Sequence, residues 1–302
     1  MVETKKISLL TGFIITICGA VLFSTKAIIV KKAFADIQVG ALALLTLRMV
    51  FSLPFYLVAA FWISNKKENI KLTLKQWLYV ILLGLCGYYL SSFLDFTGLQ
   101  YVSAGLERLI LFLYPSFAVL INALVFKQVL NKKQGIALAL TYVGIAIAYF
   151  GELHIDTSNP DFLFGSFLIF LCAITYAMYI VGSGRIIPII GATKFTAYAM
   201  LSATLGIFIH FILAGQLFTF SIKGDLWKYG FLIAIIATVI PSFLISFGMK
   251  RIGSNNVAIV SAIGPVATIV QAHYILGEEI FAAQIAGTIL VIVGVLFIGW
   301  KK

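Results

Sequence analysis

The sequence predicts an all-α polytopic membrane protein whose ten transmembrane helices form two five-helix repeats of inverted topology. Three observations support this fold class: the composition, the placement of the basic residues and an internal repeat. Of the 302 residues, 62% are hydrophobic and only 11% are charged, whereas about 25% of the residues in a soluble domain are charged. The apolar runs are continuous and do not alternate, which excludes a transmembrane β-barrel.

Ten apolar runs have the length of membrane spans, because a helix needs roughly 20 residues to cross the bilayer core. Their approximate limits are 8–30, 38–63, 76–98, 104–126, 134–151, 162–182, 195–214, 227–249, 254–276 and 280–300. The first run follows a charged flank, as a signal peptide would, but it is too long and lacks a small-residue cleavage site. We therefore expect it to be retained as the first helix.

The basic residues gather on one side of these spans. With the N-terminus in the cytoplasm, the cytoplasmic segments hold 15 of the 22 basic residues: Lys5, Lys6, Lys66, Lys67, Lys71, Lys75, Lys127, Lys132, Lys133, Arg185, Lys194, Lys250, Arg251, Lys301 and Lys302. The opposite loops hold Lys31, Lys32, Lys223 and Lys228. Because Lys and Arg bias sets membrane orientation, we expect a plasma (cytoplasmic) membrane protein with both termini cytoplasmic. The net charge of +11 is then an orientation signal and requires no nucleic-acid partner.

An internal repeat relates each position to the one 150 residues later. The matched pairs include Trp77 with Trp227, Tyr79 with Tyr229, Pro115 with Pro265, and the triplet SFL at 92–94 with SFL at 242–244. Trp and Pro matches in one register are hard to obtain by chance from an apolar composition. We therefore expect repeats at 1–152 and 153–302. Five spans per copy is an odd number, so the second copy enters the membrane from the opposite side.

Inverted repeats are shared by many secondary transporters, whose substrate site lies between the repeats near the membrane midplane. Five ionisable residues fall inside the predicted spans, all in the first repeat: Lys26, Arg48, Asp95, Glu107 and Arg108. Arg48 lies about 15 Å into its span, near the middle of a ~30 Å core. It either binds a substrate carboxylate or phosphate or ties helices together as a structural group. The other four lie near span ends, from which long side chains can reach the headgroups.

Polar residues follow single faces of several predicted helices. Tyr88, Ser91, Ser92 and Asp95 are spaced i, i+3, i+4 and i+7, and Ser242 repeats Ser92 in the second copy. Such a face can line a cavity, although polar side chains also join helices in lipid. Other residues predicted to contribute to the cavity are Tyr176, Tyr179, Ser261 and Gln271. We expect bends or hinges at Pro115 and Pro265.

Other chemistry has little support in the sequence. The chain has no HExxH motif, no cysteine cluster and no GxxxxGK[ST] loop. We therefore expect no metal, no cofactor and no ATP bound by a P-loop. A membrane-embedded lipid-modifying enzyme would need a nucleophile beside Asp95 and Glu107, and no nucleophile motif is present. The sequence thus favours a transporter over an enzyme, while a non-transporting scaffold remains an alternative that would not need a polar cavity.

Three stretches resemble the drug/metabolite transporter superfamily, in particular its ten-helix EamA-type members. They are LTLRMVFSLP in the second span, AGLERLILFLYPSFAVLINAL in the fourth, and NNVAIVSAIGPVATIVQAHYILGEEI in the ninth. The resemblance implies a gradient-driven metabolite carrier, often an exporter of amino acids, with a cavity between helices one, three, four, six, eight and nine. The small multidrug exporters of this superfamily carry a glutamate in helix one, where this chain has Lys26 and no acid.

We therefore expect a secondary active transporter that exports a small anionic or zwitterionic metabolite, such as an amino acid, by alternating access. Arg48 or Lys26 would bind the carboxylate, and Asp95 or Glu107 would carry a coupling proton. The expected partners are the solute and the lipid bilayer, with the chain a monomer or a homodimer. An organic-cation or multidrug exporter is the main alternative.

Overall fold

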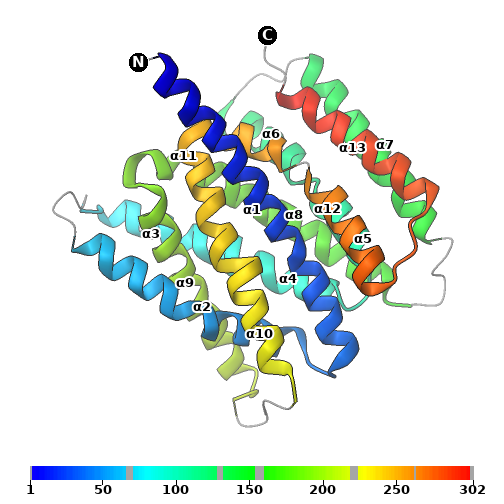
Figure 1. Cartoon of the computed structure of the whole chain (residues 1–302), viewed down its shortest axis with the longest axis horizontal. Helices are drawn as coiled ribbons and strands as arrows, with labels where there is room; N and C mark the ends of the chain where they lie inside the picture. Colours follow the sequence, from blue (N-terminus) through cyan, green and yellow to red (C-terminus); the bar gives the residue numbers. More distant parts are fainter. Residues whose placement is uncertain are drawn as a thin grey trace.

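The computed structural model describes residues 2–65, 71–127, 132–153, 160–217, 224–261 and 263–299. Within these ranges every regular element is a helix. Seven helices are long and apolar enough to cross a membrane, and three shorter apolar helices, Ala139–Phe150, Ile263–Leu276 and Ala282–Gly294, lie in the other predicted spans. Both termini lie at one end of the molecule (Figure 1). The predicted fold class, a polytopic helical membrane protein built from two repeats, is confirmed.

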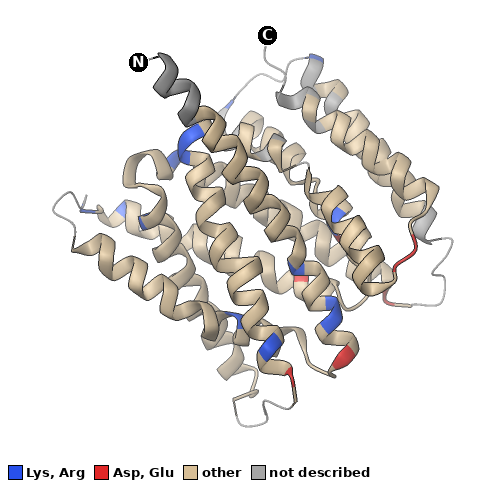
Figure 2. Ribbon diagram, in the orientation of Figure 1, with Lys and Arg blue, Asp and Glu red and all other residues tan. Residues whose placement is uncertain are grey.

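The first repeat contains α1 (Val2–Asp36), α2 (Ala41–Ser64), α3 (Leu74–Gly84), η1 (Leu85–Leu90), α4 (Ser91–Gly98), α5 (Ala104–Leu111), α6 (Tyr114–Phe126) and α7 (Lys132–Leu153). The second repeat contains α8 (Phe162–Ile190), α9 (Ala192–Leu213), α10 (Leu226–Ala234), η2 (Ile235–Val239), α11 (Ile240–Val260), α12 (Ile263–Gln271), η3 (Ala272–Leu276) and α13 (Ala282–Gly299). Figure 2 shows that the central parts of these helices carry few charged residues, as lipid contact requires.

The third and eighth spans share a π-helical turn at matching positions. The turn η1 interrupts the third span between α3 and α4, and η2 interrupts the eighth 150 residues later. A π-turn widens a helix by one residue per turn and leaves backbone groups to be satisfied locally. In η2 the hydroxyl of Thr238 donates to the carbonyl of Ile233, at 2.9 Å. In η1, Gly87 lies so close to Tyr179 that an added Cβ would come within 2.3 Å of the ring.

The fourth and ninth spans are broken rather than continuous. In the fourth, α5 ends at Leu111 and α6 begins at Tyr114, with Pro115 in its first turn. In the ninth, the chain turns at Gly253, whose φ of 79° lies in the left-handed region, and breaks again before Pro265. The interruptions predicted from the two prolines are therefore present at corresponding places. Their role as moving hinges stays a prediction.

Helices of one repeat pack mainly on helices of the other. Helix α1 packs on α11 and α12, α2 on α9 and α10, and α4 on α8. The fifth and tenth spans, α7 and α13, lie side by side at one edge of the molecule (Figure 1). Gly144 contacts Gly287 there, and a Cβ added at either glycine would meet the other's carbonyl oxygen, at 2.7 and 2.4 Å. The symmetry mate of Gly144 in sequence is Gly294, so the glycine that Gly144 contacts is not the one matched by the repeat.

A substitution in α7 tests this close approach. Gly144→Ala should destabilise the protein by roughly 1–3 kcal/mol, because the added methyl forces the two backbones apart. Gly135→Ala, in the same helix, meets nothing within 4 Å and should leave stability unchanged or slightly higher. Thermal unfolding of the two variants in one detergent measures the difference. Equal melting temperatures would show that α7 and α13 are not held at the distance described.

Candidate functional site

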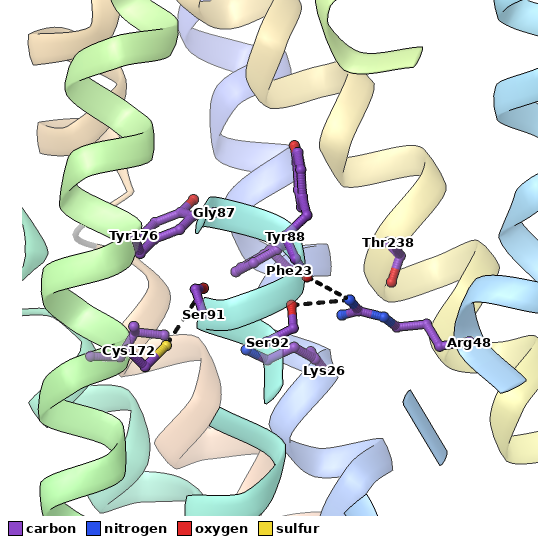
Figure 3. A pocket seen from close by; sticks show the side chains of 11 residues that line it. Phe23, Lys26, Arg48, Gly87, Tyr88, Ser91, Ser92, Cys172, Tyr176 and Thr238 are labelled. Carbon is purple, nitrogen blue, oxygen red and sulfur yellow. Dashed lines mark hydrogen bonds between the residues drawn. The ribbon is translucent and has the colours of Figure 1, made fainter. Parts of the chain in front are cut away.

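A small cavity lies between the two repeats. It is lined by Phe23, Lys26, Arg48, Gly87, Tyr88, Ser91, Ser92, Leu111, Cys172, Tyr176 and Thr238 (Figure 3). These residues come from α1, α2, η1, α4, α5, α8 and η2.

Five of the residues predicted to bind substrate line this cavity: Lys26, Arg48, Tyr88, Ser92 and Tyr176. The other five, Asp95, Tyr179, Ser242, Ser261 and Gln271, lie outside its lining. Substrate contact by these five, as by the first five, stays a prediction. Ser91 was recognisable from the sequence as a member of a polar face, and Thr238 precedes Ser242 by one helical turn. Phe23, Leu111 and Cys172 carry no sequence signal, because an apolar residue that lines a cavity resembles one that fills a core.

Arg48 is a buried cation with a neutral environment. Its side chain is 3% exposed, and its Nη2 donates to Ser92 Oγ at 3.0 Å and more weakly to the Tyr88 carbonyl at 3.5 Å (Figure 3). The guanidinium carbon lies 5.1 Å from the Phe96 ring centre. No carboxylate of the described residues lies within 4.0 Å of it, and its Nε has no hydrogen-bond partner. A charge in this state lacks the compensation that buried ions normally need.

Lys26 is the centre of a cluster of buried charges, in which its positive charge is paired with carboxylates. Its Nζ lies 2.6 Å from Asp95 Oδ2 and 3.8 Å from Glu107 Oε1. Lys26 is 4% exposed, and both acids are fully buried. The three side chains come from α1, α4 and α5, so the ion pairs connect three helices of the first repeat. Their positions near the span ends would allow long side chains to reach the headgroups, but here the three side chains lie inside the protein, where one cation is shared by two carboxylates.

Arg108 lies in the interface between the repeats. Its guanidinium carbon is 5.7 Å from the Phe23 ring centre, and its Nη2 would lie 2.4 Å from a Cβ added to Gly264 of α12. The absence of a side chain at Gly264 is what leaves room for the guanidinium. Lys26 lies 5.1 Å from the centre of the same ring. Phe23 therefore separates two cations and forms one apolar wall of the cavity.

Hydroxyl pairs join helices around the cavity. Tyr179 donates to the Tyr88 hydroxyl at 2.8 Å, which connects α8 to η1. The hydroxyls of Tyr56 and Ser242 lie 2.9 Å apart and connect α2 to α11. Tyr56 is fully buried, and nothing in its sequence context distinguished it from an ordinary aromatic core residue. In the structure, Tyr179 and Ser242 thus serve first to hold the two repeats together.

These features define the class of protein: a polytopic helical membrane protein with a small cavity, lined partly by polar and charged side chains, between two related halves. The chain belongs to the EamA-like transporter family, which it matches over residues 10–150 and 163–300. It is 30% identical to the uncharacterized transporter YcbK of Bacillus subtilis (strain 168), over 91% of this chain and 88% of that protein. It is also 22% identical to the WAT1-related protein At5g07050 of Arabidopsis thaliana, over 80% and 69% of the two chains.

A solved crystal structure of a protein 18% identical to this chain has the same fold, with a TM-score of 0.67 over 95% of each chain. The family and the transporter-named relatives point to a membrane transporter rather than an enzyme. Among the described residues, no three His, Cys, Asp or Glu side chains are grouped closely enough to hold a metal ion.

The charge cluster makes a prediction about stability. Lys26→Met should destabilise the protein by about 3–5 kcal/mol, because it leaves two buried carboxylates without their shared cation. The double variant Lys26→Met with Asp95→Asn should recover part of that loss. Lys32→Met, at an exposed position of the same helix, should change stability by less than about 0.5 kcal/mol. Unfolding midpoints in detergent measure these differences, and strictly additive effects of the two substitutions would contradict the pairing.

Proposed function

We propose that this protein is a secondary active transporter for a small anionic or zwitterionic metabolite, such as an amino acid. The observation that carries the proposal is Arg48, a buried guanidinium in the cavity wall with no carboxylate among the described residues within 4.0 Å. A substrate carboxylate bound there would supply the missing negative charge. Arginine suits this role because its planar donor fork matches a carboxylate in two parallel hydrogen bonds.

The charge balance of the membrane interior supports an anionic ligand. The five ionisable residues singled out in the first-repeat spans are three cations, Lys26, Arg48 and Arg108, and two anions, Asp95 and Glu107. Lys26 is already paired with both acids. One monovalent anion at Arg48 would bring the set to neutrality, which lowers the cost of holding charge away from water. An organic cation would raise the imbalance instead.

The remainder of the lining suits an amphipathic solute. The hydroxyls of Ser92 and Thr238 lie on the Arg48 side of the cavity, and that of Ser91 lies beside Cys172, while the rings of Phe23 and Tyr176 stack with centres 6.1 Å apart (Figure 3). Polar groups at one side would fix the orientation of a carboxylate, and the rings would cover its apolar part. We propose that transport proceeds by alternating access between the repeats, in the direction of export, with both termini in the cytoplasm.

Binding can be tested by ligand-induced thermal stabilisation of the purified protein. Amino acids and small organic acids should raise the melting temperature of wild type, because a ligand at 100 times its Kd adds about 2.7 kcal/mol of stability. Arg48→Gln should abolish this shift and Arg48→Lys should retain part of it. Lys228→Gln removes a cation at an exposed site paired with Asp225 and should bind as wild type does.

Two results would contradict the proposal. Stabilisation by organic cations alone would favour a multidrug exporter. Arg48→Gln protein that no longer folds, or that folds and binds anions with wild-type affinity, would make Arg48 a structural tie between α2 and the third span.

Proton coupling is proposed for the Lys26 cluster, with Glu107 as the proton carrier. Asp95 is held at 2.6 Å from Lys26, whereas Glu107 lies farther from the same cation, at 3.8 Å. Glu107→Gln should therefore bind solute but lose the acceleration of uptake by an imposed pH gradient in proteoliposomes. Asp95→Asn should weaken binding as well, because it releases Lys26. A pH-gradient response retained in Glu107→Gln would exclude this residue as the carrier.

A further inference from the structure

The segment 277–281, between the ninth and tenth spans, contains two consecutive acids that the proposed binding site does not use. The carboxylate of the first, Glu278, accepts hydrogen bonds from the backbone N–H groups of Ala104 at 2.9 Å and Gly105 at 3.2 Å. These are the first two residues of α5, which belongs to the other repeat. The segment lies at the end of the molecule away from the termini (Figure 1), which we call the distal face.

Glu278 completes the N-terminus of α5. The first N–H groups of a helix have no partner within the helix, and a carboxylate there also interacts favourably with the helix dipole. Ser103 Oγ accepts from the N–H of Leu106 at 3.0 Å, so the residue before α5 supplies one cap and Glu278 supplies the other two bonds. The second repeat therefore holds the first turn of a helix of the first repeat through charge-assisted hydrogen bonds.

Two local features position the backbone around Glu278 beside α5. Gly277 adopts a left-handed conformation with φ of 73°, and His273 Nδ1 donates to the Glu278 carbonyl at 2.9 Å. On α5, a Cβ added to Gly105 would come within 2.3 Å of Gln284 Nε2. Glycine at this position leaves room for the Gln284 side chain of α13 to lie against α5. One turn further along, α5 carries Glu107 and Arg108 toward the cavity.

The residues of the fourth span are more deeply buried in its distal half than in its other half. Every residue from Ala104 to Ser116 is buried, whereas each residue from Phe117 to Ala123 is half-buried. Leu111, at the end of α5, lines the cavity. Helix α5 therefore stands between the cavity and the distal face, and Glu278 holds its outer end.

We propose that Glu278 is the distal gate residue of the transporter, a positioning residue that keeps α5 closed over the cavity. Release of its carboxylate from Ala104 and Gly105 lets α5 separate from the segment 277–281 and opens the cavity to the distal face. This inference rests on the proposed transport function for its meaning. It does not depend on the identity of the solute.

The buried thiol of Cys172 reports on this gate, because it lines the cavity and is 2% exposed. The experiment uses full-length protein in intact cells with Cys18→Ser and Cys86→Ser, so that Cys172 is the remaining thiol. A membrane-impermeant methanethiosulfonate is added from the distal side, and the rate of Cys172 modification is measured. Glu278→Ala loses both charge-assisted hydrogen bonds and should react at least about tenfold faster than the parent, since about tenfold is already expected for losing one, with Glu278→Gln intermediate.

Glu279→Gln is the matched control, because the neighbouring Glu279 is exposed and makes no contact with α5 in the hydrogen bonds described. The control should react at the parental rate. Distal reactivity that is unchanged in Glu278→Ala, or raised equally in the control, overturns the proposal. If Glu278→Ala does not fold, Glu278→Gln decides by the same criteria. Faster labelling in a protein that binds no anion would support the gate and reject the proposed substrate class, so the two failures are distinguishable.

Discussion

The cost of burying charge in an apolar interior is the constraint on which this structure depends. Lys26, Asp95 and Glu107 lie in a region that excludes water, and each is acceptable there only because the others are within reach. Their pairing fixes α1, α4 and α5 relative to one another. It also leaves Arg48 as the cation of the cavity wall whose charge no described carboxylate compensates within 4.0 Å. The packing of these helices and the proposed binding of an anion therefore both follow from how the buried charges are paired.

The need to satisfy buried polar groups separates residues that hold the repeats together from residues available to a solute. Tyr179 and Ser242 of the second repeat each form a hydroxyl pair with a tyrosine of the first repeat, Tyr88 and Tyr56 respectively. Arg108 occupies the space that Gly264 leaves open. Arg48 differs in position, because it lines the cavity, where its bond to Ser92 orients it and its Nε has no hydrogen-bond partner. Such a cavity combines a rigid frame with a cation that a solute can reach.

Composition and periodicity predicted the fold because the bilayer demands long apolar helices, and because Trp77 and Trp227 or Pro115 and Pro265 revealed the duplication. The polar residues of the cavity were partly predictable, since Tyr88 and Ser92 share a helical face. The grouping of Lys26 with Asp95 and Glu107 was not, because it depends on how α1, α4 and α5 pack. Nor could the contact of Glu278 with α5 be foreseen, since its partners are backbone N–H groups that leave no trace in the sequence.

The π-turns at matching positions bear on the order of events in the duplication of the chain. Trp77 and Trp227 precede the two turns and Ser92 and Ser242 follow them, and the separation is 150 residues on both sides. An insertion in only one copy would have shifted that register by one. The widened turn therefore belonged to the five-helix unit before it was copied. The buried cluster of Lys26, Asp95 and Glu107 belongs to the first copy and distinguishes it from the second: an ancestor of two identical units would have had either two such charge clusters or none.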